Sequence, residues 1–226
     1  MLLAAGKGER MRPLTLDTPK PLLSVAGRPL IEHHIRRLAA AGLREIVINV
    51  SWLGQRIIAF CGDGSRWGVD LQFSQEDQPL ETAGGIVQAL ELLGDRPFLV
   101  VNADTWTDYP FAELAGRSLG AREARLVLVD NPEHNLPGDF SLRPPRVLAR
   151  LDETLTFAGI GLYDPSFFSA CRPGPQPLLP LLEVAIAEDR LLGERYGGQW
   201  TDVGTPERLA ELRRQHPATT GKNDRQ

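Results

Sequence analysis

The residues best suited to binding phosphate lie near the start of the chain, in the stretch LAAGKGERMRPLTLDTPKP from Leu3 to Pro21. Gly6 and Gly8 allow a sharp backbone turn and a close approach to a ligand. Backbone N–H groups in such a turn can point at phosphate oxygens. The stretch predicts a polyphosphate-binding loop, because its basic residues outnumber its acidic ones in an otherwise acidic protein: Lys7, Arg10, Arg12 and Lys20 against Glu9 and Asp17.

This loop differs from two common nucleotide-binding motifs. A P-loop requires G-x-x-x-x-G-K-[ST], and no such string follows Gly6. A Rossmann dinucleotide loop requires a third glycine at position 11, which is Met11 here. Two glycines with basic neighbours also occur in ordinary surface turns, so the spacing alone leaves that alternative open.

A second polar segment, QEDQPLETAGG from Gln75 to Gly85, follows an expected strand and opens an expected helix. Thr82 is expected to cap that helix. A helix N-terminus with two glycines suits close backbone approach to a ligand. The Glu76 carboxylate could accept a hydrogen bond from N3–H of uracil, or from N1–H and the amine of guanine, so the residue type leaves the base open. A capped helix start with solvated acids is the alternative.

Two carboxylates stand at the ends of expected strands. Asp104 lies in VVNADTW and Asp202 in WTDVGT. Mg²⁺ is commonly held by one or two carboxylates together with substrate phosphates. Their separation along the chain does not show that the two acids converge, so a turn aspartate and a helix-capping aspartate remain the alternatives.

The overall composition excludes several other classes of protein. The net charge of −4 lacks the basic excess of a nucleic-acid-binding surface. The 2 cysteines form no CxxC pair, the 4 histidines have no metal-ligand spacing, and no GxSxG motif is present. No apolar run reaches the roughly 18 residues of a membrane span, and no signal-peptide core is present. We therefore expect a cytoplasmic protein, with a monomer as the default.

Strand-like and helix-like runs alternate along the chain, which predicts an α/β fold with a doubly wound mixed sheet. In such sheets ligands bind at the carboxyl ends of the strands, where the glycine loop and both acids fall. Only Met1–Ala5 precede the loop, so either residues are missing before Met1 or the first strand is short. Residues 213–226 are expected to be a disordered tail. The expected strands are 2–5, 45–50, 69–74, 98–101, 126–129, 155–163 and 200–203, with short antiparallel strands within 130–151, and the expected helices are 29–41, 52–60, 83–93, 111–114, 178–187 and one from 206.

The complete first loop resembles the signature of the sugar-nucleotide pyrophosphorylase (nucleotidyltransferase) family, G-x-G-x-R-x-x-P-x-T-x-x-x-P-K. The segment from Trp200 to Thr205 also matches that family's W-x-D-x-G-T motif, while its G-D motif reads Ala103-Asp104. The resemblance implies a Rossmann-like, GT-A-like nucleotidyltransferase fold in a single domain. It also implies an enzyme that joins a sugar 1-phosphate to the nucleoside monophosphate of an NTP and releases pyrophosphate. The fixed positions of the signature are filled by Gly6, Gly8, Arg10, Pro13, Thr15, Pro19 and Lys20.

The same resemblance implies roles for individual residues. Arg10 and Lys20 would be catalytic, by neutralising charge on the phosphates, and Asp104 and Asp202 would hold Mg²⁺. Residues 1–212 would form the nucleotidyltransferase domain, with about 1–110 binding the nucleotide and 111–212 the sugar. The nucleotide would contact Ala5, Gly6, Gly8, Glu76, Glu81, Thr82 and Ala83.

Further strings, among them QPLETAGG, VNADTWTDYPF, PGDFSL and LTFAGIGL, resemble the family's N-acetylmuramate 1-phosphate uridylyltransferases, which act in peptidoglycan recycling. That resemblance implies UTP and N-acetylmuramate 1-phosphate as substrates. The E-K-P motif of glucose-type relatives is missing, and the corresponding stretch is 148–155. The lactyl ether requires space and a cation or an amide, for which the sequence assigns no residue. The residues expected to form the sugar site are Asn102, Trp106, Asp130, Asn131, Gly138, Asp139 and Gly159.

Other activities remain open at the level of sequence. A mannose 1-phosphate guanylyltransferase or a glucose 1-phosphate nucleotidyltransferase would differ mainly in residues 76–83 and 130–140. A non-catalytic subunit that binds a sugar nucleotide would be expected to lose the basic residues or acids of the motifs, all of which are present. Transfer to a non-sugar phosphate such as choline phosphate is the remaining alternative.

Overall fold

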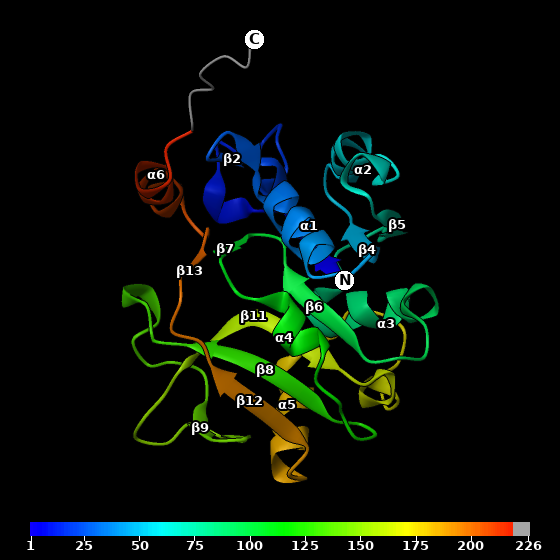
Figure 1. The fold of residues 1–226 in the computed structure, drawn as a ribbon, viewed down its shortest axis with the longest axis vertical. Coiled ribbons are helices and arrows are strands. Elements are labelled where there is room, and N and C mark those ends of the chain that lie inside the picture. Colours follow the sequence, from blue (N-terminus) through cyan, green and yellow to red (C-terminus); the bar gives the residue numbers. More distant parts are fainter. Residues whose placement is uncertain (219–226) are drawn as a thin grey trace.

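The computed structural model describes residues 1–218, which fold around a nine-stranded mixed sheet (Figure 1). The parallel part, β5, β4, β1 and β6, contains the short strand β1 between two longer neighbours. The second half of the sheet begins at β11, which is antiparallel to both β6 and β8. The strands in sheet order are β5 (Asp70–Gln75), β4 (Glu45–Val50), β1 (Leu2–Leu3), β6 (Phe98–Asn102), β11 (Thr156–Tyr163), β8 (Ala124–Val129), β12 (Leu191–Arg195), β10 (Arg146–Leu148) and β9 (Ser141–Arg143).

The parallel strands bring the predicted motifs to one edge of the sheet. Leu2 lies opposite both Ile48 and Val101, so β1, β4 and β6 run in register and end together. The carboxyl ends of parallel strands meet at the same edge. The glycine loop leaves this edge after β1, and Asp104 follows the end of β6. The doubly wound mixed sheet that the sequence predicts is thus confirmed.

Helices cover both faces of the sheet (Figure 1). On one face, Ile31 and Ile35 of α1 (Leu30–Ala40) pack in a cluster with residues of α2 (Gly54–Cys61) and α4 (Phe111–Ala115). On the other face, α3 (Glu81–Leu93) and α5 (Leu179–Ala187) bury residues such as Ile86 and Leu182. The spacing of 31 and 35 is one helical turn, so a single stripe of α1 faces the sheet.

A smaller cluster joins the C-terminal helix α6 (Pro206–Gln215) to the glycine loop. Leu209 and Leu212 of α6 pack with Met11 and with the hairpin of β2 (Ser24–Val25) and β3 (Arg28–Pro29). Beside it, β7 (Thr105–Thr107) pairs with β13 (Trp200–Asp202). These contacts position the loop and both acids from the far end of the sequence. Short 3-10 helices complete the fold: η1 (Glu9–Met11), η2 (Lys20–Leu22), η3 (Ser65–Trp67), η4 (Glu133–Asn135) and η5 (Pro165–Phe168).

Several elements differ from the sequence-based expectations. The strands β2, β3, β7 and β12 were not expected. The first three are only two or three residues long, and β7 and β12 are stabilised by strands distant in the sequence. Helix α3 begins at Glu81 with Leu80 at its N-cap, so Thr82 lies inside the helix and the cap prediction was wrong. Helix α6 continues through Arg213 and Arg214 to Gln215. Basic side chains at this end stabilise the helix by interacting with the negative end of its dipole. The prediction of a disordered tail from residue 213 was therefore wrong for residues 213–215, which are helical. Residues 219–226 of the expected tail lie outside the described part of the chain.

Within residues 1–218, the structure contains no helix that is long and apolar enough to cross a membrane.

A buried histidine on α1 is expected to make the protein less stable in mild acid. His34 is 1% exposed, and its Nε2 lies 2.8 Å from the carbonyl oxygen of Thr105. Burial lowers the pKa of His34 from 6.5 to about 4. The unfolded chain therefore binds more protons than the folded one as pH falls below 6.5, and the free energy of unfolding decreases by up to about 1.4 kcal/mol per pH unit.

Urea denaturation between about pH 7 and about pH 5 tests this expectation. The wild-type free energy of unfolding should fall more steeply with acid than that of a His34→Gln variant, in which this titration is absent. Parallel slopes for the two proteins would remove His34 as the source of the pH dependence.

Candidate active site

The glycine loop forms one wall of a cavity of about 540 Å³ at the carboxyl edge of the sheet. Gly8 has a φ of 62°, and its carbonyl oxygen accepts hydrogen bonds from the backbone N–H of Met11 at 2.9 Å and from Thr15 Oγ1 at 2.7 Å. A Cβ at Gly6 would meet no heavy atom within 4 Å, so the backbone there is open to the cavity. The sequence folds this way because glycine tolerates the left-handed φ and Thr15 closes the turn.

Three cations of the loop, Lys7, Arg10 and Lys20, line this cavity, and the last two differ in their surroundings. Lys20 is only 9% exposed, and its Nζ lies 2.5 Å from Oδ2 of Asp104. Arg10 is exposed and has no ion-pair partner among residues 1–218. Lys20 is therefore held in a fixed position beside an acid, whereas the Arg10 guanidinium is free to meet an anionic ligand.

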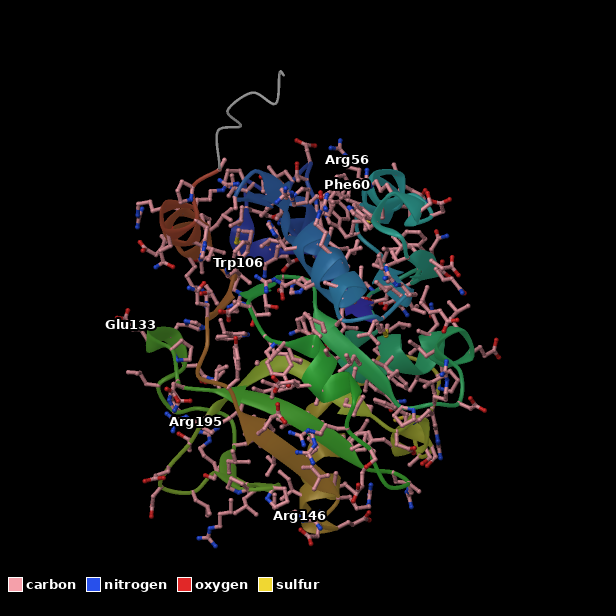
Figure 2. The ribbon with its side chains drawn as sticks, in the orientation of Figure 1. Arg56, Phe60, Trp106, Glu133, Arg146 and Arg195 are labelled. Atoms are coloured by element: carbon pink, nitrogen blue, oxygen red, sulfur yellow. The ribbon has the colours of Figure 1, made fainter. Side chains whose placement is uncertain are left out.

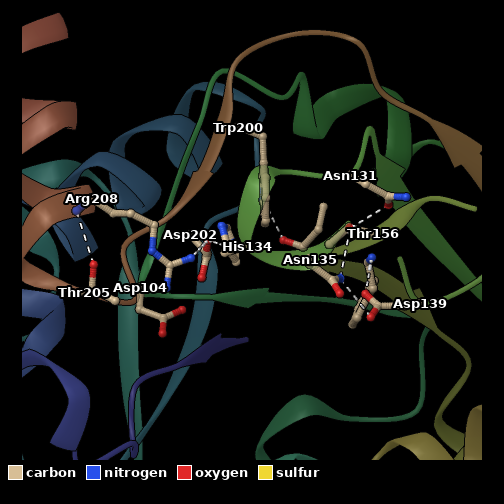
Figure 3. A network of polar contacts seen from close by, with 12 residues as sticks. Asp104, Asn131, His134, Asn135, Asp139, Thr156, Trp200, Asp202, Thr205 and Arg208 are labelled. Atoms are coloured by element: carbon tan, nitrogen blue, oxygen red, sulfur yellow. Dashed lines mark hydrogen bonds and ion pairs between the residues drawn. The ribbon is translucent and has the colours of Figure 1, made fainter. Parts of the chain in front are cut away.

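The structure brings the two predicted acids together through strand pairing (Figure 3). Asp202 pairs with Thr105 across β7 and β13, and the N–H of Val203 donates to the carbonyl oxygen of Asp104 at 2.9 Å. The side chains of Asp104 and Asp202 remain 38% and 26% exposed. Strand pairing thus brings two distant segments together: Asp104 lines the cavity that also contains the loop, and Asp202 lies two residues before Gly204, which lines it as well.

Both acids keep one oxygen available for a ligand. Asp202 Oδ1 accepts from Arg208 Nη1 at 2.6 Å and lies 2.8 Å from His134 Nε2, while Asp104 uses Oδ2 for Lys20. The other oxygen of each carboxylate has no hydrogen-bond partner in the described part of the chain. Sequence reasoning did not assign Arg208 and His134 to the site, because no local motif links either of them to Asp202.

A divalent cation fits this pair of acids. Among residues 1–218 there is no group of three or more histidine, cysteine or acidic side chains that could enclose a metal ion. An ion such as Mg²⁺ needs no such cage, since it retains water molecules and takes further oxygens from substrate phosphates. Asp104 and Asp202, each with a free carboxylate oxygen on paired segments near the glycine loop, match that requirement.

A second cavity of about 320 Å³ adjoins the first and contains the predicted base-binding residues Ala5, Glu76, Glu81 and Thr82. Glu76 is 5% exposed and accepts from Asn49 Nδ2 at 2.6 Å and from the N–H of Leu80 at 3.0 Å. The amide of Asn49 in turn accepts from the N–H of Ala4 at 2.8 Å. Asn49, which the sequence did not single out, therefore fixes the Glu76 carboxylate to the strand that carries the glycine loop.

The N-terminus of α3 is only partly open to a ligand, because Glu81 and Thr82 line the second cavity but the next two N–H groups are occupied. The N–H groups of Ala83 and Gly84 donate to the carbonyl oxygen of Gln176 at 3.0 Å and 3.1 Å. Ala83 is fully buried and does not line the described cavities. Its expected role in nucleotide binding is therefore contradicted, because residue 176 already occupies the position in front of the helix.

Glu81 adopts a left-handed backbone conformation where the second cavity meets a third. Its φ is 61°, a region that costs a non-glycine residue about 1–2 kcal/mol. We expect a Glu81→Gly variant to have a higher free energy of unfolding than Glu81→Ala, by about 1 kcal/mol. Both variants lack the carboxylate, so chemical denaturation of this matched pair isolates the backbone effect. Equal stabilities would mean that the backbone relaxes when the side chain is removed.

The third cavity, of about 570 Å³, contains two of the residues predicted for the sugar, Asn102 and Asp139. Three other predicted residues support its walls. Asn131 Oδ1 accepts from Thr156 Oγ1 at 2.9 Å (Figure 3). Gly138 and Gly159 both have a positive φ, and a Cβ at either would lie within 3.0 Å of an asparagine side chain, Asn131 or Asn102.

Two residues predicted for the sugar site lie elsewhere. Trp106 is 8% exposed, with its ring 4.5 Å from that of His33 and 4.6 Å from that of His216, so it belongs to the core around α6 (Figure 2). The Asp130 carboxylate pairs with Arg195 at 2.6 Å, and Asp130 does not line the described cavities. Both residues lie near cleft residues in the sequence, but the direction of their side chains in the fold keeps them out of the cleft.

Together, the three cavities form one connected cleft. Asp104 lines the first and second cavities, and Glu81, Thr82 and Asn102 line the second and third. The arrangement combines an open glycine backbone, the loop cations and Asp104 at one end with a mixed polar and apolar wall at the other. Such a site can hold a polyphosphate next to a second, bulkier substrate.

Comparison with known proteins agrees with this geometry. The Nucleotidyl transferase family model matches residues 1–140, which include the glycine loop, Glu76 and Asp104. An N-acetylmuramate alpha-1-phosphate uridylyltransferase of Neisseria meningitidis is 50% identical over 93% of this chain and 95% of its own length. A protein of the same name from Caulobacter vibrioides is 34% identical over 92% of both chains. A mannose-1-phosphate guanyltransferase of Yarrowia lipolytica is 44% identical, but this chain spans only 60% of it.

Solved structures show the same fold. A crystal structure from Bacillus anthracis, assigned as a glucose-1-phosphate thymidylyltransferase, superposes with a TM-score of 0.84 over 98% of this chain and 96% of the other, at 22% identity. That likeness concerns the fold, and the family model and the relatives add the sequence match. The chain belongs to the nucleotidyl transferase family.

Proposed function

We propose that this protein transfers UMP from UTP to N-acetylmuramate 1-phosphate, giving UDP-N-acetylmuramate and pyrophosphate, as a step of peptidoglycan recycling. The observation that carries the proposal is the 50% identity to the Neisseria uridylyltransferase over nearly the full length of both proteins. The guanyltransferases match over a similar part of this chain, but they are longer proteins.

On the nucleotide side, we assign the triphosphate to the first cavity and uracil to the second. The open backbone at Gly6 and the turn at Gly8 would contact the phosphates, with Arg10 neutralising their charge. Glu76 accepts hydrogen bonds from Asn49 and Leu80, which orient its carboxylate to accept one more from N3–H of uracil. We further propose that residues 1–110 bind mainly the nucleotide and residues 111–212 mainly the sugar.

The reaction would be an in-line attack by a phosphate oxygen of the sugar 1-phosphate on the α-phosphorus of UTP. The attacking oxygen is already ionised, so no general base is required. Negative charge grows on the α-phosphate and on the departing pyrophosphate, and fixed cations stabilise it without reorganisation. Lys20, held 2.5 Å from Asp104, supplies such a cation, and the protein contributes mainly positioning and charge.

We assign Mg²⁺ to Asp104 and Asp202, which offer hard oxygen ligands at the phosphate end of the cleft. When bound, the ion would neutralise phosphate charge and help align the two substrates. Arg208 and His134 orient the Asp202 carboxylate, and the pairing of β7 with β13 fixes the spacing of the two acids.

Pyrophosphate release in the presence of Mg²⁺ tests the proposal, with five NTPs (UTP, GTP, CTP, ATP and dTTP) crossed against the 1-phosphates of N-acetylmuramate, N-acetylglucosamine, glucose and mannose. Turnover confined to UTP with N-acetylmuramate 1-phosphate would support it. Turnover with GTP and mannose 1-phosphate, or with another pair, would reassign the substrates within the family. No turnover with any pair would contradict the proposed activity.

A further inference from the structure

The third cavity of the cleft contains one feature that the proposed reaction has not used, an unpaired arginine. Arg150 follows β10 in the stretch 148–155, where the family's E-K-P motif is missing. Its side chain lines the cavity together with Asn102, and it is exposed. Among the lining residues it is the only cationic one, and no ion pair joins it to another residue of the described chain.

The other charges around this cavity are negative. Glu81, Asp139 and Glu183 line it as well. Asp139 is engaged within the protein, since its Oδ1 accepts from Asn135 Nδ2 at 3.1 Å and its Oδ2 from the N–H of Phe157 at 2.8 Å. An anionic group entering the cavity would therefore be repelled by two free carboxylates unless Arg150 met it.

The remaining wall is apolar, formed by Phe140, Phe157, Leu178, Leu182 and Ile186. The cavity connects to the phosphate end of the cleft through Asn102, which stands two residues before Asp104 at the end of β6. A sugar whose 1-phosphate lies near Asp104 would extend its ring past Asn102 and its ring substituents into this cavity. An apolar wall beside one cation matches a substituent that carries both a methyl group and a carboxylate.

We propose that Arg150 binds the lactyl carboxylate of N-acetylmuramate 1-phosphate and thereby selects this acceptor over N-acetylglucosamine 1-phosphate, an inference that rests on the proposed function. The two sugars differ only in the lactyl ether, whose methyl group would contact the apolar wall. A guanidinium presents two parallel N–H donors that fit a carboxylate, and hydrogen bonds to charged groups are the stronger kind. Arg150 is thus a specificity residue and takes no part in the transfer step.

Calorimetric binding of UDP-N-acetylmuramate and UDP-N-acetylglucosamine tests this assignment without requiring turnover. Arg150→Met should weaken binding of UDP-N-acetylmuramate by about 10- to 100-fold and leave UDP-N-acetylglucosamine unchanged. Arg150→Lys should retain part of the preference, because it keeps the charge but not the paired donors. Arg143→Met, an exposed position on β9 that does not line the described cavities, is the matched control and should bind both ligands as the wild type does.

Four results would contradict the assignment or the proposed function on which it rests. Equal weakening of both ligands by Arg150→Met would mean that Arg150 acts on a phosphate or on the fold, and unchanged binding of both would mean that it does not touch the ligand. A wild-type protein that does not prefer UDP-N-acetylmuramate would contradict the proposed function itself. A wild-type preference that survives in Arg150→Met would contradict only the role of Arg150.

Discussion

Replacing Lys20 with alanine is expected to lower kcat by about 10²- to 10³-fold while the protein stays folded. The ammonium group is nearly buried and lies 2.5 Å from Asp104, so its position is fixed before the substrates arrive. A preorganised charge of this kind stabilises the transition state without the cost of reorientation. The remaining Asp104 carboxylate is 38% exposed and can be hydrated, so we expect no loss of fold.

Steady-state rates of two further Lys20 variants separate charge from packing. Lys20→Met keeps most of the aliphatic stem and should be as slow as Lys20→Ala. Lys20→Arg keeps the charge in a bulkier planar group and should recover only part of the rate. Circular dichroism and the melting temperature serve as the control for folding. A folded Lys20→Ala protein with nearly normal kcat would remove Lys20 from the catalytic machinery.

Neutralising either acid is expected to have the second large effect. Asp104→Asn and Asp202→Asn should each reduce the rate by at least about 100-fold and raise the Mg²⁺ concentration needed for half the maximal rate by about 10-fold or more. The amide keeps the size of the side chain but gives up the charge and one oxygen ligand. The measurement is the rate as a function of Mg²⁺ concentration at saturating substrates.

Both substitutions should carry a structural cost. Asp104 neutralises Lys20, whose side chain is 10% exposed, and Asp202 neutralises Arg208, whose side chain is 18% exposed, so each variant should have a lower melting temperature than the wild type. Asp70→Asn is a matched control, because Asp70 is exposed and begins β5, away from the carboxyl edge of the sheet. An unchanged Mg²⁺ titration in either folded variant would count against that acid as a ligand.

The sequence by itself determined the order of the main strands and helices and the place of the glycine loop. These features depend on local signals. The run IVINV predicts a strand buried on both faces, the apolar stripe of α1 predicts a helix on the sheet, and Gly8 tolerates the turn that Thr15 closes. The fold class followed, because alternating strands and helices form a doubly wound sheet whose strand ends lie at one edge.

Only the tertiary structure decided which side chains meet at the cleft. Asn49 orients Glu76, Arg208 and His134 orient Asp202, and Arg150 enters the third cavity, although no short motif joins any of these residues to its partner. Trp106 shows the converse, since it lies two residues from Asp104 and yet points into the core.

The physical reason is the range of the interactions. Backbone preference and hydrophobic period are set by residues within a turn or a strand, so they can be read along the chain. The direction of a side chain and its partner depend on strand pairing and packing between distant segments, as in the pairing of β7 with β13 that sets Asp104 beside Asp202. Such contacts exist only after the chain has folded.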